Sequence, residues 1–393
     1  MLIHVGIVSD QALANLIPAL AEKPDKIYLI ATEEIEGRGL PLRLRRVFQS
    51  KGVKAEIIRG APYAGLESIL EFARSKVGER LQKVHPTARI ILNATGGTKL
   101  MALGFVEVFR DRGARIIYTD TAHRCIESLP VPGQTHGSST PMVNVLDVET
   151  YLAAQGFEIN CARSDDPEWI EGAARRRMAA EFLAERIKER SVQNLVGALN
   201  GLAHKALDRQ RKLIAPKQAL DSDPRTPWPE LLDRLQEFGL LRWAGRSLEF
   251  MDEGSTRFLH GDWLEEYAWH VLRDEHPFDI RLGVEGRWDA AHAANNEFDV
   301  LATRMNELLF IECKTLKHGE EDAKDADLLY KVDSLGQDVR GLFGTTWILS
   351  AREPTQFMID RANQQRLGLF GPPEIVTLRT HVRNWLAADS GRG

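Results

Sequence analysis

The sequence reads Asn296-Glu297-Phe298-Asp299 and, after a short turn, Leu308-Leu309-Phe310-Ile311-Glu312-Cys313-Lys314. Apolar residues lie on both sides of the turn at 304–307, which predicts a β-hairpin. With Arg304 opposite Glu307, Asp299 lies opposite Glu312 and Glu297 lies opposite Lys314. Because side chains alternate between the two faces of a strand, this register places three carboxylates and one lysine on the same face.

This acidic face is expected to be partly buried, because apolar residues surround it in the sequence. Burying a carboxylate costs free energy unless it is paired with a cation or hydrogen-bonded. A divalent metal ion beside Lys314 would remove that cost. The alternative is a solvated edge face of mixed charge, which needs no ligand at all.

Composition is that of an ordinary globular protein, with 393 residues, 43% of them hydrophobic and 27% charged. The formal net charge of -5 argues against a strongly basic surface for binding nucleic acid. Cys125, Cys161 and Cys313 lie far apart without metal-ligand spacing, which indicates a reducing, cytoplasmic setting without disulfides. No apolar run reaches the length of a transmembrane helix, so no membrane partner is expected.

Residues 1–150 alternate between strand and helix patterns, which is typical of a doubly wound, mostly parallel, Rossmann-like α/β sheet. Strands are expected over 3–8, 26–30, 55–58, 89–92 and 115–118, and helices over 11–22, 40–51, 65–82 and 98–112. Residues 130–141 have the composition of a loop, and 143–146 could return as a further strand.

Residues 151–255 differ in pattern and are expected to form a small helical connector. A hairpin over 240–250 follows helical segments, so this connector resembles a winged helix. Residues 256–393 form the third predicted unit, an α/β domain. It opens with a helix that carries Glu265, continues with the acidic hairpin and a helix around 328–339, and contains a strand over 347–350.

Two loops of the first unit follow predicted strands. Ser9-Asp10-Gln11 follows the first strand, and Asn93-Ala94-Thr95-Gly96-Gly97-Thr98-Lys99 follows the fourth. Open α/β sheets bind ligands at the carboxyl ends of their strands, and a glycine-rich turn into a helix can present amides to an anion. A purely structural turn, and a capping role for Ser9 or Asp10, remain alternatives.

Asp299 followed by Glu312-x-Lys314 resembles the PD-(D/E)xK nuclease superfamily. The resemblance implies that Asp299 and Glu312 hold Mg²⁺ or Mn²⁺, with the backbone carbonyl of Cys313 as a further ligand. Lys314 would orient the attacking water or neutralise charge, and Glu265 would complete the metal site or hold a second metal ion. For Glu265 two alternatives stay open: a capping box with Asp262, or Glu266 in its place.

The two loops of the first unit are similar to those of a CARF domain, the CRISPR-associated Rossmann fold. Joined to the nuclease motifs, they make most of the chain resemble the ancillary nucleases of type III CRISPR systems. The resemblance implies a homodimer that binds cyclic tetra-adenylate across its two-fold axis. The implied ligand-binding residues are Ser9, Asp10, Gln11, Asn93, Thr95, Gly96, Gly97, Thr98 and Lys99.

The function expected from this resemblance is metal-dependent endonucleolytic cleavage of DNA, RNA or both, switched on by the cyclic oligoadenylate in antiviral defence. Two other functions are kept open. The chain could be a ligand-responsive regulator that binds DNA without cleaving it. It could also be a constitutive restriction or repair nuclease whose first unit only dimerises.

Overall fold

The computed structural model describes residues 1–130, 133–289, 295–315 and 344–387. The chain divides into two compact units. Unit 1 holds Met1–Glu158 together with Arg304–Asn306, and unit 2 holds Ile159–Thr303 and Glu307–Ala387. Within the described ranges, no helix is long and apolar enough to cross a membrane.

Unit 1 is built on a seven-stranded sheet of order β3-β2-β1-β4-β5-β6-β7. The first five strands in the chain pair in parallel, and β6 and β7 extend the sheet antiparallel. This confirms the predicted doubly wound sheet, and each predicted strand is present. The strands are β1 Leu2–Ile7, β2 Lys26–Ile30, β3 Lys54–Ile58, β4 Arg89–Asn93, β5 Arg115–Asp120, β6 Cys125–Ser128 and β7 Ser138–Pro141.

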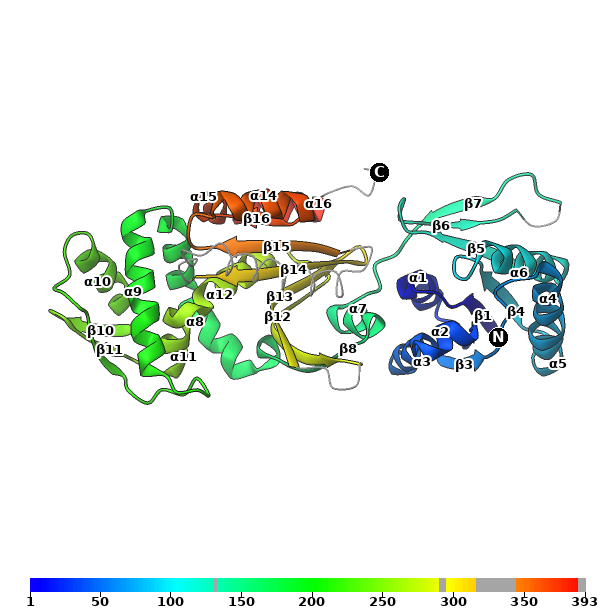
Figure 1. Ribbon diagram of the computed structural model, residues 1–393, viewed down its shortest axis with the longest axis horizontal. Helices are drawn as coiled ribbons and strands as arrows, with labels where there is room; N and C mark the ends of the chain where they lie inside the picture. The colour runs from blue at the N-terminus through cyan, green and yellow to red at the C-terminus, as the bar shows by residue number, and fades with distance from the viewer. Residues whose placement is uncertain (131–132, 290–294, 316–343, 388–393) are drawn as a thin grey trace. The chain divides into compact units, whose positions relative to one another are not determined.

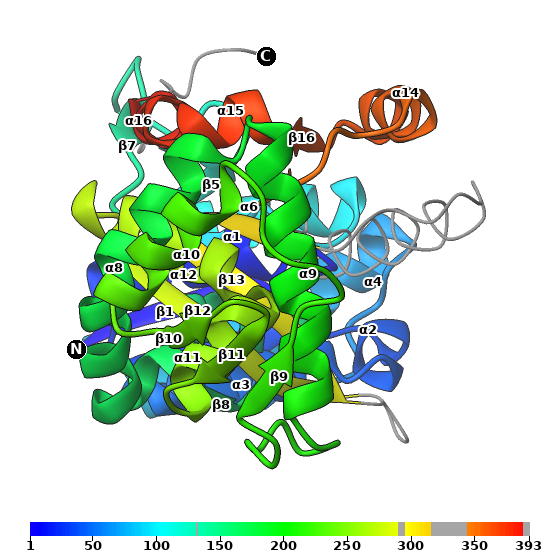
Figure 2. The ribbon, with the colours of Figure 1, turned by 90° about the vertical axis from the view of Figure 1, so that its left-hand side faces the viewer.

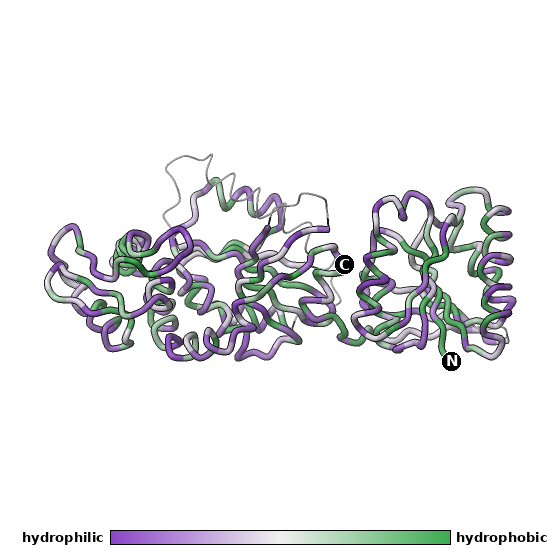
Figure 3. Tube along the Cα trace, turned by 90° about the horizontal axis from the view of Figure 1, so that it is seen from below, coloured by the Kyte–Doolittle hydropathy of each residue, from purple (hydrophilic) through white to green (hydrophobic). Residues whose placement is uncertain are grey.

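Helices lie on both faces of this sheet (Figure 1). Hydrophobic residues run along its central strands (Figure 3), because a parallel sheet covered on both faces needs apolar side chains on both. The helical segments are α1 Ala12–Glu22, α2 Glu33–Gly37, α3 Leu40–Ser50, α4 Leu66–Glu71, η1 Phe72–Glu79, α5 Arg80–Val84, α6 Lys99–Asp111 and α7 Val148–Gln155.

Two expectations for the end of unit 1 are wrong. Residues 138–141 are not loop but strand β7, which pairs with β6. Residues 143–146 are not a strand: Oδ1 of Asn306 accepts bonds from the amides of Val145 and Leu146 at 2.9 and 3.2 Å. The side chain of Asn306 therefore binds the backbone amides of Val145 and Leu146, which a neighbouring strand would bind if these residues formed a strand.

Unit 2 contains a six-stranded mixed sheet of order β16-β15-β14-β13-β12-β8. Strands β12 and β13 pair antiparallel, whereas β14, β15 and β16 pair in parallel. The strands are β8 Phe157–Ala162, β12 Asp279–Trp288, β13 Asn295–Arg304, β14 Glu307–Lys314, β15 Gly344–Ser350 and β16 Gly368–Phe370. Their inward side chains share one apolar core with the helices α8, α9, α10 and α12.

The connector region carries α8 Pro167–Arg186, α9 Arg190–Ala206 and α10 Trp228–Glu237. A three-stranded sheet, β10-β11-β9, lies beside them, as Figure 2 shows. Its strands are β9 Lys217–Ala219, β10 Leu241–Ala244 and β11 Ser247–Phe250. The hairpin expected over 240–250 is confirmed, with Leu241 opposite Phe250 and Ala244 opposite Ser247.

The remaining helical segments of unit 2 are η2 Arg163–Asp165, α11 Glu253–Arg257, η3 Phe258–Asp262, α12 Trp263–Asp274, α14 Gln356–Gln365, α15 Pro372–Val376 and α16 Leu378–Ala387. The helix expected around 328–339 lies outside the described residues. The division into a sensor domain over 1–150, a connector over 151–255 and a nuclease domain over 256–393 stays a prediction.

Candidate functional site

The hairpin of β13 and β14 positions the acidic residues of the nuclease motif. Met305 and Asn306 form its turn with φ of 45° and 64°, the positive values that a two-residue hairpin of type I′ requires. The amide of Cys313 donates a hydrogen bond of 2.6 Å to Oδ2 of Asp299. Asp299 is thereby fixed beside the strand segment that carries Glu312 and Lys314.

The electrostatics of Asp299 reflect a crowded acidic site. Burial, with Glu312 as the next cause, raises the pKa of the Asp299 carboxyl to about 8. Burial also raises the pKa of Glu265 well above its ordinary value, and the charge of Asp299 adds to this rise. Burial, together with the charges of neighbouring carboxylates, therefore makes ionisation of Asp299 and Glu265 unfavourable.

Lys314 supplies one cation to this cluster. Its Nζ lies 2.5 Å from Oε1 of Glu312. Burial alone would lower the pKa of Lys314, but Glu312 and Asp299 raise it overall, so the ammonium form is stable beside the carboxylates. Cys313, between Glu312 and Lys314, packs in the core as expected for the opposite face of the strand.

Glu265 lies on the first turn of α12 and interacts with Asp299. The alternative capping box with Asp262 is not formed, because Asp262 makes no side-chain cap at this helix. Instead, Asp262 accepts bonds from Arg163 at 2.8 Å and from Arg211 at 2.6 Å. Glu266 does not replace Glu265: it is buried and bound by the guanidinium of Arg176 at 2.7 Å.

The carboxylates of Asp299 and Glu312 and the peptide carbonyl of Cys313 offer the oxygen ligands that a hard divalent cation prefers. Mg²⁺ commonly keeps several waters and uses only one or two protein carboxylates. Among the described residues, no group of three or more His, Cys, Asp or Glu side chains is placed to hold a metal ion by itself. Because burial raises the pKa of Asp299, its ionised form is unfavourable on its own. A bound cation would stabilise that ionised form.

Sequence reasoning missed Arg163, whose guanidinium pairs with Glu265 and lies 3.5 Å from Oε1 of Glu297. Arg163 directly follows β8, an edge strand of the six-stranded sheet. The alternation Phe157-Glu158-Ile159-Asn160 was the available signal for that strand. No spacing in the sequence connects Arg163 with a residue 102 positions later.

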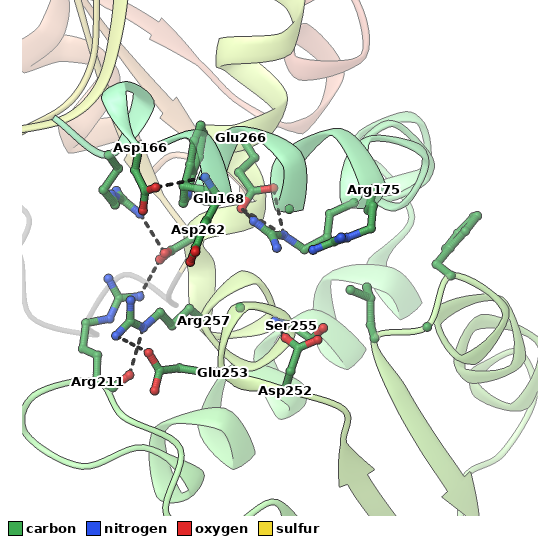
Figure 4. A pocket seen from close by; sticks show the side chains of 18 residues that line it. Asp166, Glu168, Arg175, Arg211, Asp252, Glu253, Ser255, Arg257, Asp262 and Glu266 are labelled. Carbon is green, nitrogen blue, oxygen red and sulfur yellow. Dashed lines mark hydrogen bonds and ion pairs between the residues drawn. The ribbon is translucent and has the colours of Figure 1, made fainter.

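A cavity of about 650 Å³ in unit 2 adjoins this acidic cluster. Arg163, Asp262 and Glu266 belong to its lining, together with exposed Arg175. Figure 4 shows Arg211 directed at Asp262 and Arg257 beside Glu253 within this cavity. Two further arginines of α8 are engaged in ion pairs: Arg176 with Glu266, and Arg177 with Glu181 and Asp274.

The glycine-rich loop of unit 1 connects β4 to α6 and lies next to β1. A Cβ on Gly96 would overlap the carbonyl oxygen of Ile7, and Gly97 has a φ of 76°. Only glycine allows the loop to pass this close to the end of β1. Thr98 caps α6 by accepting a bond from the amide of Met101 at 3.2 Å, and its hydroxyl donates to the carbonyl of Tyr63 at 3.0 Å.

Asn93 and Thr95 hold this loop from within. Oδ1 of Asn93 accepts bonds from the amide and hydroxyl of Thr95, at 3.1 and 2.6 Å. The hydroxyl of Thr95 in turn accepts the amide of Thr119 at 2.7 Å. Asn93 is buried and Thr95 is half-buried, and their hydrogen bonds support the loop. Direct contact of these two residues with a ligand stays a prediction.

The other predicted ligand-binding residues lie at the same end of the sheet. Gln11, Gly97, Thr98 and Lys99 are exposed, Ser9 is half-buried, and Gly96 is buried. Asp10 is exposed and pairs with Arg38 at 2.7 Å. Neither Ser9 nor Asp10 caps α1, whose N-cap is Gln11 without a side-chain bond. The loops after β1 and β4 are therefore neighbours, since Gly6 lies opposite Asn93.

Comparison with known families gives two matches that together span most of the chain. Residues 3–151 match the model of the Card1 CARF domain, and residues 252–389 match that of the Card1-like endonuclease domain. Both predicted domain types are thereby confirmed in the predicted order. A search of curated proteins found no match.

Solved structures support the same fold. Protein VC1899 from Vibrio cholerae is 24% identical, with 99% of each chain covered and a TM-score of 0.84. Can2 from Sulfobacillus thermosulfidooxidans, solved in complex with cyclic tetra-adenylate, is 24% identical, with 98% of this chain and 97% of that chain covered and a TM-score of 0.73. A type III CRISPR defence DNA nuclease activated by cyclic oligoadenylate is 20% identical over 90% of this chain and 46% of that chain, with a TM-score of 0.50.

Proposed function

The chain joins a Card1-type CARF domain to a Card1-like endonuclease domain, and we propose that a cyclic oligoadenylate bound by the first activates the second. The substrate is DNA, RNA or both, and the reaction serves antiviral defence. The observation that carries the proposal is the convergence of Asp299, Glu312 and Lys314 on one buried acidic site within an endonuclease domain.

Asp299 and Glu312 would hold the divalent cation, Mg²⁺ or Mn²⁺, with the carbonyl of Cys313 as a further ligand. When bound, the cation activates water and stabilises negative charge on the scissile phosphate. Lys314, already charged beside Glu312, orients the attacking water or offsets the charge that develops on the phosphate. Glu265 supports the site from helix α12.

The proposed activator is cyclic tetra-adenylate, the ligand in the Can2 structure. The exposed amine of Lys99 and the N-terminus of α6 would bind its phosphates. The helix has thirteen residues and is capped by Thr98. We propose that Ser9, Asp10, Gln11, Asn93, Thr95, Gly96 and Gly97 complete or support this ligand-binding site.

We propose that the active form is a homodimer. Leu100 and Leu103 lie one helical turn apart on α6, directly after the ligand loop, and are 41% and 63% exposed. Tyr63, whose carbonyl binds Thr98, is 66% exposed. Apolar side chains gathered beside a ligand loop fit a surface that a second copy covers. The free thiols Cys125, Cys161 and Cys313 agree with a cytoplasmic location.

The test is a cleavage assay with labelled single- and double-stranded DNA and RNA, with Mn²⁺ or Mg²⁺, and with cyclic oligoadenylates of three, four and six units. The proposal predicts cleavage that requires both the metal and one ring size, and that is lost in Asp299→Asn. Asp360→Asn, on the exposed surface of α14, is the matched control.

Other outcomes of the same assay would favour the alternatives. Ligand-dependent retention of intact duplex DNA would favour a regulator that does not cleave. Cleavage that is independent of every ring size, and unchanged by Lys99→Ala, would favour a constitutive nuclease.

A further inference from the structure

Arg163 contributes a fixed positive charge to the nuclease site. Its Nη1 lies 2.8 Å from Oδ2 of Asp262, and its Nη2 pairs with Oε2 of Glu265. The same Nη2 lies 3.5 Å from Oε1 of Glu297, on β13. One guanidinium therefore bridges carboxylates from α12, from η3 directly before it, and from the hairpin that carries Asp299.

The position of Arg163 is built into the fold. Its side chain is 21% exposed and lies against Gly283 of β12, where a Cβ would overlap it. Gly283 has a φ of 59°, which glycine adopts at little cost. The Nε atom of Arg163 is buried without a hydrogen-bond partner, so the side chain gives up solvation to reach the carboxylates.

The charge around the site is nearly balanced. When every group is counted as ionised, five described carboxylates and three described cations around the site leave a formal charge of -2. The carboxylates are Asp262, Glu265, Glu297, Asp299 and Glu312, and the cations are Arg163, Arg211 and Lys314. When all five carboxylates are ionised on metal binding, one divalent cation brings this formal sum to zero.

We propose that Arg163 takes the place of a second metal ion, so that each nuclease site binds one divalent cation, held by Asp299 and Glu312. In two-metal sites the ions lie about 3.5–4 Å apart, and a second ion needs oxygen ligands of its own. Here Glu265, the residue available for a second ion, is bound by Arg163. Arg163 acts as a positioning residue, because it holds Glu265 and leaves the reacting atoms to Asp299, Glu312 and Lys314.

The inference rests on the proposed metal site, and its test counts ions rather than activity. The full-length protein, freed of metal with a chelator, is titrated with Mn²⁺, and free Mn²⁺ is followed by electron paramagnetic resonance. The number of Mn²⁺ ions that the Asp299→Asn variant still binds is taken as the background and is subtracted from the number bound by each other protein. The wild type is expected to bind one Mn²⁺ per chain above this background, and Arg163→Gln to bind two.

Arg163→Lys keeps a cation and is expected to retain one Mn²⁺. Arg211→Gln, which loses only a contact to Asp262, is the matched control and is also expected to retain one. Two Mn²⁺ in the wild type, or a single ion in folded Arg163→Gln, would overturn the inference. If Arg163→Gln does not fold, the number of Mn²⁺ ions bound per wild-type chain alone tests the inference. No Mn²⁺ above background in the wild type would instead overturn the proposed metal site itself.

Discussion

The backbone amide of Cys313 donates a 2.6 Å hydrogen bond to the Oδ2 atom of Asp299. This bond ties the carboxylate on β13 to the segment of β14 that carries Glu312 and Lys314. A carboxylate held by a backbone group needs no further ordering when it binds a cation, which is the kind of preorganisation that catalytic sites require.

Lys314→Met should reduce cleavage by about 10²-fold or more, because it removes the charge that we propose orients the attacking water or offsets charge on the phosphate. The fold should persist, since methionine retains the length and apolar stem of lysine. Single-turnover rates with ligand and metal saturating measure the effect. The matched control is Lys217→Met, at an exposed position of β9. Equal rates for wild type and Lys314→Met would contradict the assigned role.

Metal affinity should increase with pH. The folded, metal-free protein keeps a proton on Asp299 up to a pKa of about 8, whereas the unfolded chain releases it near pH 4. The folded state binds more protons between these values, so the stability of the metal-free protein should decline as the pH rises from about 4 towards 8. The cation must displace this proton, so its affinity should rise by up to about tenfold per pH unit below 8.

Calorimetric titration of Mn²⁺ at pH 6, 7 and 8 measures this dependence, and two buffers of different ionisation enthalpy reveal the proton released at pH 7. Asp360→Asn should leave the profile unchanged. An affinity that is constant from pH 6 to 8, with no proton released, would show that Asp299 is not the group that exchanges a proton for the metal.

Gly96→Ala should abolish ligand binding and destabilise unit 1 by about 1–3 kcal/mol, because the new methyl group overlaps the carbonyl of Ile7. Differential scanning fluorimetry with and without cyclic tetra-adenylate reports both effects. Gly37→Ala is the control, since a Cβ there meets no atom within 4 Å. A normal ligand-induced shift in Gly96→Ala would mean that the loop need not approach β1 so closely.

Lys99→Ala should weaken the binding of cyclic tetra-adenylate by about tenfold or more, because a charge-assisted contact to phosphate is worth about 1.5–3 kcal/mol. Lys99 is exposed at the start of α6, so thermal stability without ligand should not change. Calorimetry with the ligand measures the affinity, and exposed Lys76 is the site of the control substitution to alanine. Equal losses in both variants would indicate only a general effect of charge.

Asn306→Gly should destabilise the protein by about 1–3 kcal/mol, because it leaves the buried amide of Leu146 without its acceptor. The side chain also donates to the carbonyl of Val143 at 2.7 Å, a bond that is lost as well. Glycine tolerates the φ of 64° at this turn, so the backbone should be retained. Urea denaturation compares this variant with Met305→Gly, an exposed position in the same turn; equal destabilisation would contradict the role of the Asn306 side chain.

Much of the fold could be predicted because it depends on local patterns. The strands of unit 1 follow apolar runs that end at turn residues, and the hairpin of β13 and β14 follows from alternation around a two-residue turn. The acidic site was predictable for the same reason: its members lie within sixteen residues of one another, and hairpin geometry alone brings Asp299 towards Glu312 and Lys314.

What could not be predicted depends on contacts between distant segments. Residues 143–146 have the composition of a strand, but the side chain of Asn306 binds their backbone in another conformation. Arg163 approaches Glu265 only because β8 joins the edge of the nuclease sheet beside β12. The capping box that was open as an alternative at Asp262 is not formed, and two arginines from other segments bind that carboxylate instead.

The most direct measurement of the central claim is the location of the metal. Crystals of the full-length protein soaked with Mn²⁺ should give an anomalous difference peak within coordination distance of the carboxylates of Asp299 and Glu312, with Lys314 beside it and Arg163 still bound to Glu265. An anomalous peak elsewhere, or none in crystals that diffract well after soaking, would contradict the account.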